Sequence, residues 1–286
     1  METIGKQEIW SLRDGATKAE PRTCTQVRKG RAHKVETFLE LATKVAELQF
    51  MNRDHVLLFR GQAVDYRNAQ NNTTLKPTLF RPRSEGNPSS GVLIHRFQDL
   101  KRAEQLLVES YQQKEFIGSE RLKRHQIVRW SILQHYEVCP TPLLDVTHSL
   151  RIAASFGSGD EENEAFIFVL GVPNLSGAIT ASAEAGLQIV RLSSVCPPAA
   201  LRPHIQEGYL LGEYPEMIGY EQKELYAHYE IDFGRRLVAK FRFSPSTFWK
   251  MDAFPKVERK ALYPSSSADP LRKMAEQIKK KLNVGN

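Results

Sequence analysis

The chain has 286 residues, of which 41% are hydrophobic, and 40 Lys and Arg against 33 Asp and Glu give a formal net charge of +7. This size supports one large core or two small ones, and the basic excess favours anionic partners such as nucleic acid or nucleotide phosphates, although a basic protein without such a partner has the same charge. Three scattered cysteines without a CxxC pair argue against a disulfide framework and a structural zinc site. Because no signal peptide or membrane-spanning run is visible, we expect a cytoplasmic protein without a membrane partner.

Residues 1–32 are polar and basic, and we expect them to form a loosely held N-terminal arm ahead of a single domain over residues 33–286. From His33, apolar residues recur at three- and four-residue spacing and predict a helix. A Val- and Leu-rich strand over residues 55–59 follows, and a loop rich in Asn, Pro and Gly covers residues 67–92.

The remaining elements separate by type along the chain. Helices are predicted over residues 94–116 and 121–136 and from residue 148 onward, strands over residues 165–172, 187–192 and 237–243, and a final helix over residues 270–282. Helices dominate the first half and strands the second. This segregation predicts an α+β fold rather than a parallel βαβ sheet.

Several motifs of known chemistry are absent. The chain has no P-loop, no GxSxG elbow and no HExxH motif, and its eight histidines show no metal-ligand spacing. We therefore expect neither a classical serine hydrolase nor a zinc hydrolase, and we expect no metal site.

An arginine ends the predicted strand 55–59, in the sequence Phe59-Arg60-Gly61-Gln62. A guanidinium binds phosphate through two parallel hydrogen bonds, and an adjacent glycine lets another chain segment or a ligand come close. These residues predict an anion clamp, or alternatively a strand end at which Arg60 is solvated.

Further segments follow in a characteristic order. They are Leu75-Lys76-Pro77-Thr78-Leu79-Phe80-Arg81, Gln134-His135-Tyr136, Pro140-Thr141-Pro142-Leu143-Leu144-Asp145-Val146-Thr147, the helix with Ala153, Ala154 and Phe156, Gln206-Glu207-Gly208, Phe241-Arg242-Phe243-Ser244-Pro245 and Leu262-Tyr263-Pro264. Together with Phe59-Arg60-Gly61-Gln62, this series resembles the FRG domain family, which is named for its (Phe/Tyr)-Arg-Gly motif. The resemblance runs from Val35 to Leu282.

The chain departs from the family pattern in its middle motif. Glu137 stands where the family has a glycine, one extra residue precedes Pro140, and Val146 replaces a tryptophan. The transfer of family roles is therefore weaker here than at Arg60.

The order of these segments is also similar to that of ADP-ribosyltransferases, in which an arginine at the end of the first strand holds the phosphates of NAD. This similarity implies helices flanking a mostly antiparallel, split sheet, with NAD as a substrate. It implies a catalytic set of Arg60, Thr147, Gln206 and Glu207. The implied NAD-binding set is Arg60, Gly61, Gln62, Arg81, His135, Tyr136, Asp145 and Phe156.

Most of these residues have a structural alternative. His135 lies in a helical row with apolar neighbours and is either a ligand or a core histidine. Asp145 or Thr147 is either a site residue or the cap of the following helix. In a strand, only one of Gln206 and Glu207 faces the site.

The sequence thus predicts an NAD-dependent mono-ADP-ribosyltransferase that modifies a nucleic acid or protein target, in the manner of a bacterial toxin or antiphage effector. An RNA or protein target and an antitoxin or regulatory partner are the expected partners. The alternative is a non-catalytic nucleotide- or RNA-binding module, and a nuclease-like protein is less favoured because no cluster of acidic metal ligands is visible.

Overall fold

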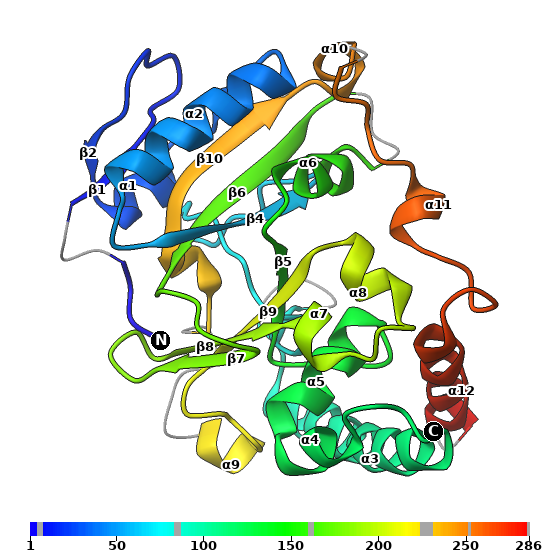
Figure 1. The fold of residues 1–286 in the computed structure, drawn as a ribbon. Helices are drawn as coiled ribbons and strands as arrows, with labels where there is room; N and C mark the ends of the chain where they lie inside the picture. Colours follow the sequence, from blue (N-terminus) through cyan, green and yellow to red (C-terminus); the bar gives the residue numbers. More distant parts are fainter. Residues whose placement is uncertain (5–7, 83–86, 160–162, 224–230, 251–252, 285–286) are drawn as a thin grey trace.

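The computed structural model describes residues 1–4, 8–82, 87–159, 163–223, 231–250 and 253–284 (Figure 1). The strands are β1 (Ile9–Ser11), β2 (Glu20–Arg22), β3 (His33–Lys34), β4 (Val56–Gln62), β5 (Leu144–Thr147), β6 (Ala165–Val172), β7 (Ile179–Ser182), β8 (Leu187–Arg191), β9 (Gly208–Glu213) and β10 (Leu237–Phe243). The helices are α1 (Cys24–Lys29), α2 (Phe38–Met51), α3 (Ser90–Gln113), α4 (Ser119–Arg124), α5 (Gln126–His135), α6 (Leu150–Ser158), α7 (Leu192–Val195), α8 (Leu201–Ile205), α9 (Tyr220–Lys223), α10 (Pro245–Phe248), α11 (Arg259–Leu262) and α12 (Pro270–Val284). The short 3₁₀ turns in the described part of the chain are η1 (Thr78–Phe80) and η3 (Phe233–Arg236).

Eight strands form one sheet in the order β3-β10-β6-β4-β5-β9-β8-β7, and β1 pairs with β2 separately. The predicted α+β class is confirmed. The sheet is mixed, because β3 runs parallel to β10, while the other described pairings in it are antiparallel.

The two central strands of this sheet barely pair. β4 pairs with β6 along its full length from Val56 to Gln62, but in the described part of the chain it pairs with β5 only at Phe59 and Thr147. The sheet therefore has two halves, β3-β10-β6-β4 and β5-β9-β8-β7, which are joined at one residue pair.

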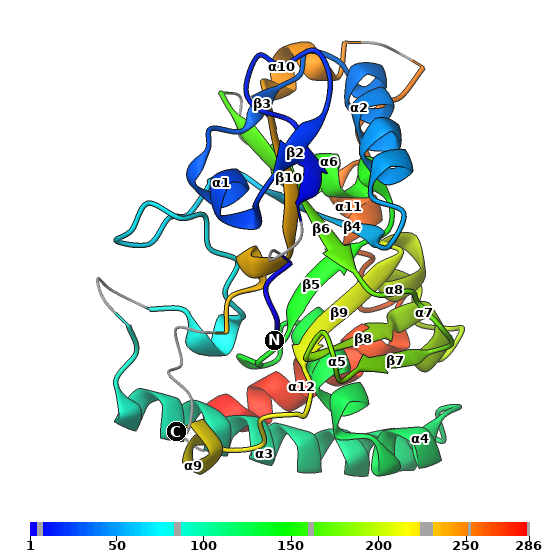
Figure 2. The same cartoon turned by 90° about the vertical axis from the view of Figure 1, so that its left-hand side faces the viewer.

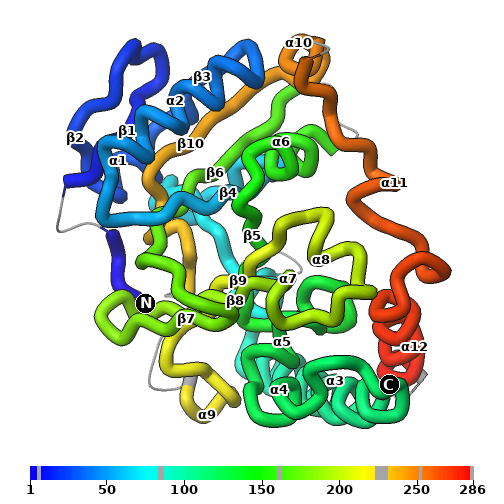
Figure 3. Tube along the Cα trace, in the orientation of Figure 1, coloured from blue at the N-terminus to red at the C-terminus, as the bar shows by residue number. Residues whose placement is uncertain are grey.

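Helices cover both faces of the first half, as Figure 2 shows: α1 lies on one side of β10 and β6, and α2 and α6 lie on the other. Helices α3, α4, α5 and α12 gather beyond the second half, where α12 packs along α3 (Figure 3). Within the described residues, none of the helices combines the length and the apolar content needed to cross a bilayer.

The sequence predicts a loose basic arm over residues 1–32, but the described part of this segment packs closely. Ile9, Leu12, Cys24 and Val27 are buried in the main core. A capping box between Thr23 and Gln26 starts α1, since each side chain bonds the backbone N–H of the other residue.

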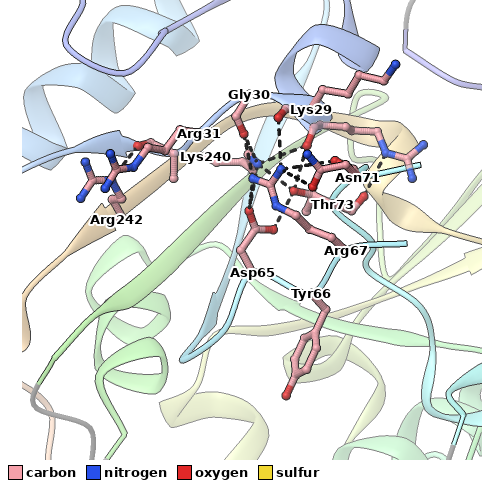
Figure 4. Close-up of polar contacts among 12 residues, drawn as sticks. Lys29, Gly30, Arg31, Asp65, Tyr66, Arg67, Asn71, Thr73, Lys240 and Arg242 are labelled. Atoms are coloured by element: carbon pink, nitrogen blue, oxygen red, sulfur yellow. Dashed lines mark hydrogen bonds and ion pairs between the residues drawn. The ribbon is translucent and has the colours of Figure 1, made fainter. Parts of the chain in front are cut away.

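The backbone of this segment is bound to the sheet by Lys240 of β10 (Figure 4). The buried Nζ of Lys240 donates to the Gly30 carbonyl at 2.8 Å, to Asp65 Oδ2 at 3.0 Å and to Thr73 Oγ1 at 2.7 Å. Arg67 donates to the same Asp65 carboxylate and to the Gly30 carbonyl. A buried ammonium with this many acceptors holds the segment in place, because removing any acceptor would leave a buried donor unpaired.

Most long elements lie where the sequence predicts them, and the differences have local causes. The single helix expected over residues 121–136 breaks at His125, whose extended backbone (φ −111°, ψ 110°) separates α4 from α5. Periodicity alone does not predict strands β5 and β9. β5 has only four residues and β9 contains Gly208 and Gly212, so neither shows a clear two-residue period.

Position 61 has no room for a side chain, because α6 lies directly on β4 there. A Cβ on Gly61 would stand 1.8 Å from the carbonyl oxygen of Ala153 and 2.6 Å from the backbone nitrogen of Gly157. Gly157 is restricted in turn, since its own Cβ would stand 2.9 Å from the Phe166 carbonyl. The glycine that the sequence assigns to a close approach therefore serves the approach of a helix backbone.

We expect Gly61→Ala to lower the free energy of unfolding by about 3 kcal/mol or more, because the clashing atoms belong to backbone that cannot move aside. Gly91→Ala is the matched control, since Gly91 lies in α3 with nothing within 4 Å of a Cβ, and it should leave stability unchanged or raise it by up to about 1 kcal/mol. Urea unfolding measures both. Equal stability of the two variants would contradict this packing.

Candidate functional site

A cavity of about 420 Å³ lies where the two halves of the sheet meet, and Phe59 and Thr147, which join the halves, are part of its wall. Further lining residues come from α5, α6, α8, the segment around η1 and Tyr263. No group of three or more His, Cys, Asp and Glu side chains that could hold a metal ion occurs among the residues described.

Most of the residues that the sequence singles out come together here. The lining includes Arg60, Gly61, Arg81, His135, Asp145, Thr147, Phe156 and Gln206. Three other predicted residues, Gln62, Tyr136 and Glu207, do not line the cavity.

Arg60 makes one hydrogen bond through its guanidinium and leaves another donor without a partner among the described residues. Its Nη1 donates to the backbone carbonyl of Asp145 at 2.5 Å, whereas its Nε is buried and has no acceptor among the described residues. Burial lowers the pKa of Arg60 to about 10, helped by the positive charge of Arg81 and opposed by Asp145 and Tyr263. The guanidinium therefore keeps its charge at neutral pH, in a cavity and not at a solvated strand end.

Arg81 brings a second guanidinium to the same cavity. Its Nε donates to the Lys76 carbonyl at 2.8 Å, which fixes the side chain, and its outer nitrogens have no partner in the described part of the chain. Burial lowers the pKa of Arg81, while the nearby Asp145 carboxylate raises it. Arg81 is therefore held by a backbone carbonyl and not by a salt bridge to a described residue.

Asp145 is oriented by its neighbours on α5. The Oε1 of Gln134 accepts from the hydroxyls of Thr78 at 2.9 Å and Thr141 at 2.6 Å, so the Gln134 amide nitrogen points at Asp145 Oδ2 and donates to it at 2.7 Å. His135 Nδ1 lies 3.5 Å from Asp145 Oδ1. Asp145 is thus held in the cavity and does not cap α6.

Asp145 remains ionised despite its position. Burial raises the pKa of Asp145, but the contact with His135, the positive charge of Arg60 and the hydrogen bond from Gln134 outweigh it and hold the pKa below its ordinary value. Burial lowers the pKa of His135, against the opposing effect of Asp145. We infer a neutral His135 beside an ionised Asp145, in which Arg60 and the hydrogen bonds stabilise the carboxylate.

His135 is 3% exposed, and its Nε2 is buried without a hydrogen-bond partner among the described residues. It is therefore a core histidine by its burial and also a lining residue of the cavity. The alternative in which His135 binds a ligand stays a prediction.

Thr147 is occupied structurally. Its hydroxyl donates to the Gln206 carbonyl at 2.8 Å and accepts from the backbone N–H of Ser149 at 3.0 Å, at the start of α6. Thr147 is therefore not the N-cap of α6, which is Ser149, but its hydroxyl holds the backbone just before that helix. Gln206 is buried and donates to the Leu262 carbonyl at 2.6 Å.

Glu207 does not supply a carboxylate to the cavity. It is exposed in a turn between α8 and β9 with a left-handed backbone (φ 45°), not in the strand that the sequence suggests. The carboxylates in the lining are Asp145 and Glu137.

The other two predicted residues outside the lining serve neighbouring parts. Gln62 ends β4 with its Oε1 buried. Tyr136 is buried, and its hydroxyl donates to Asp269 Oδ2 at 2.9 Å, so its role is structural and it does not line the cavity.

Sequence reasoning misses several lining residues. Gln134, Thr78 and Tyr263 lie within the quoted motif segments and could have been found there. Arg202 carries no sequence signal, because a single arginine on the five-residue helix α8 resembles any surface arginine. Tyr263 meets Phe156 edge to face, with ring centres 5.9 Å apart, and the two rings form an aromatic wall.

The sequence model of the FRG domain matches residues 55–165. This chain carries an FRG domain. The matched range is shorter than the Val35–Leu282 range of motif resemblance and runs from the residue before β4 to the first residue of β6. No curated protein and no solved structure matches the chain.

The FRG domain match includes Arg60, Arg81, His135 and Asp145, whereas Arg202 and Gln206 lie beyond it. The cavity is therefore built from the FRG segment together with α8 and the segment that follows α11. The resemblance to ADP-ribosyltransferases stays a prediction.

The lowered pKa of His135 predicts a pH-dependent stability. The unfolded chain takes up a proton on this histidine near its ordinary pKa of about 6.5, whereas the folded protein takes it up only at lower pH. Stability is therefore fully present above pH 6.5 and falls as the pH drops toward the folded pKa.

Urea unfolding between pH 7.5 and pH 5 should show this fall, and His135→Gln should reduce its slope. His204→Gln, at an exposed position of α8, controls for the loss of a histidine. An unchanged slope in His135→Gln would show that His135 is not held neutral by burial.

Proposed function

We propose that the cavity binds the pyrophosphate of NAD and that the protein is a mono-ADP-ribosyltransferase. The observation that carries the proposal is the anchored Arg60, whose Nε is buried without a described acceptor while the ionised Asp145 stands beside it. A buried donor without a partner costs about 1–3 kcal/mol. An anion that enters the cavity removes this cost.

The shape of the Arg60 guanidinium suits a phosphate. Because Nη1 is bound to the Asp145 carbonyl, the edge formed by Nε and Nη2 is the edge available for two parallel hydrogen bonds. Arg81 lines the same cavity and adds a second guanidinium charge for the pyrophosphate. Two guanidiniums in one cavity match the two negative charges of a pyrophosphate.

Asp145 suits the glycosyl-transfer step. Cleavage of the bond between nicotinamide and ribose passes through an oxocarbenium-like state, as glycoside cleavage does, and a nearby carboxylate stabilises that cation. The bonding electrons leave with nicotinamide, the acceptor forms the new bond to the ribose carbon, and its proton passes to a base in the cavity. Asp145 takes the role that the sequence assigns to Glu207, because Glu207 lies outside the cavity.

The aromatic wall of Phe156 and Tyr263 offers a packing surface for a nicotinamide or adenine ring. The net charge of +7 favours a nucleic acid over a protein as the acceptor. A role as a growth-arresting toxin or antiphage effector, with a neutralising partner, is a further part of this proposal and rests on the family resemblance alone.

A second candidate is a nucleotide-binding module without catalysis. It is favoured by the engagement of both Asp145 oxygens, one with Gln134 and the other near His135, which leaves the carboxylate less free to act on a substrate. The two candidates share the phosphate clamp and differ only in what Asp145 does.

The test combines labelled NAD with cellular RNA and protein, and measures both transferred label and ADP-ribose affinity. Arg60→Lys keeps the positive charge but cannot donate two parallel hydrogen bonds to one phosphate. We expect it to weaken ADP-ribose binding about tenfold or more. Asp145→Asn should keep most of the binding and lose transfer by about a hundredfold or more. Arg124→Lys, at an exposed position of α4, is the control.

Each outcome selects one account. Transfer by the wild type that survives Asp145→Asn contradicts the role of Asp145. Arg60-dependent binding without any transfer selects the binding module. If neither ADP-ribose nor NAD binds, the nucleotide assignment is wrong.

A further inference from the structure

Arg202 of α8 has an incomplete set of partners. The residue is 8% exposed, and its Nη2 donates to Glu137 Oε1 at 2.8 Å. Its Nε is buried and has no acceptor among the residues that the structure describes, and Arg202 is one of the residues that line the cavity. Nε–H and Nη2–H form one edge of a guanidinium, and this edge can donate two parallel hydrogen bonds to two oxygens of one anion. The contact with Glu137 uses only the Nη2 donor.

The Arg202 side chain is held in place by groups other than Glu137. Its guanidinium carbon lies 4.5 Å from the ring centre of Tyr263 and 5.7 Å from that of Tyr136. Asp269 accepts from the Arg202 backbone N–H at 3.0 Å and from the Tyr136 hydroxyl at 2.9 Å, which fixes this end of α8. A guanidinium that is positioned beforehand loses little freedom when an anion binds.

Glu137 is a weak partner for this guanidinium. Its side chain is 61% exposed, and ion pairs that solvent reaches contribute little to stability. Its backbone is left-handed (φ 55°), a conformation that is unfavourable for a residue with a Cβ. The pair is therefore easy to open, and strained residues of this kind are concentrated at ligand sites.

We propose that Arg202 is a second phosphate-binding subsite of the cavity. In this proposal the Glu137 carboxylate competes with phosphate for Arg202, and its side chain rotates away when a phosphate group binds. The phosphate takes the Nε and Nη2 edge of Arg202 through two hydrogen bonds. Glu137 turns outward into solvent, which its exposure allows.

Arg202 and Arg60 line the same cavity as the Asp145–His135 pair. Arg60 donates to the Asp145 carbonyl, and the Arg202 guanidinium lies over the Tyr263 ring. A reacting centre at Asp145 therefore shares its cavity with both cations, and each cation can hold a phosphate.

The phosphate has two candidate sources: the second phosphate of the bound dinucleotide, or a phosphate of a nucleic acid acceptor. The inference rests on the proposed function in placing both sources in one cavity, but phosphate binding by Arg202 does not require catalysis. A binding measurement therefore tests the subsite separately from the transfer reaction.

The experiment is calorimetric titration of the full chain with ADP-ribose, and with a short 5′-phosphorylated oligonucleotide in the presence of saturating ADP-ribose. We expect Glu137→Gln to tighten at least one of these affinities about three- to tenfold, because it removes the competing charge. Arg202→Lys should weaken the same affinity about tenfold or more, since an ammonium cannot donate two parallel hydrogen bonds to one phosphate.

Glu115→Gln is the matched control. Glu115 is also exposed and left-handed (φ 52°), but it follows α3 and does not line the cavity. It should leave both affinities within about twofold. Thermal unfolding checks that Arg202→Lys still folds, and if it does not, the Glu137→Gln result decides alone.

The arms of the experiment separate the two sources. Tighter ADP-ribose binding by Glu137→Gln assigns the subsite to the dinucleotide, and tighter oligonucleotide binding assigns it to the acceptor. If Glu137→Gln leaves both affinities unchanged, the subsite is wrong, even when the wild type transfers label from NAD. If Glu137→Gln tightens binding while no transfer occurs, the subsite stands and the transferase proposal fails.

Discussion

The direct contact between the backbone of α6 and strand β4 at Gly61 determines how the rest of the site is placed. Because neither Gly61 nor Gly157 has a Cβ, α6 lies on β4 and brings Phe156 to the cavity beside Arg60. The same helix begins just after β5, so its position also fixes where β5 meets β4. The two halves of the sheet then share the one pair Phe59–Thr147, and Arg60 and Asp145 lie next to this joint. The Phe-Arg-Gly sequence thus combines a structural glycine with a functional arginine.

The cavity concentrates charge that is only partly balanced within the described residues. Three guanidiniums (Arg60, Arg81 and Arg202) face two carboxylates (Asp145 and Glu137), which leaves 3 − 2 = +1. Buried charges are costly unless they are paired and hydrogen-bonded. Nevertheless, the Nε atoms of Arg60 and Arg202 lack acceptors among the described residues. A protein that keeps such donors beside a cavity gains most when an anion with several oxygens binds there, and this is the common basis of the transferase and binding-module proposals.

The elements and site residues that can be predicted from the sequence are those set by a local pattern, either hydrophobic periodicity or a motif. The strand that carries Arg60, the buried strand β6 and the amphipathic α12 follow from periodicity, although β4 continues past Arg60 to Gln62. Arg60, Arg81 and Asp145 follow from motif positions. Arg202 reaches the cavity only through the packing of α8 against β9 and α11, which no local pattern encodes. Glu207 was misplaced because a turn after a short helix was interpreted as a strand, and the packed N-terminal segment was missed because its few apolar residues lack a long period.

A crystal structure of the protein with bound ADP-ribose tests the central claim most directly, because the claim concerns where one anion sits. The account predicts electron density for a phosphate on the Nε and Nη2 edge of Arg60, facing Arg81, with the ribose next to Asp145. Density for ADP-ribose outside this cavity, with Arg60 unchanged and its Nε still without an acceptor, would contradict the account.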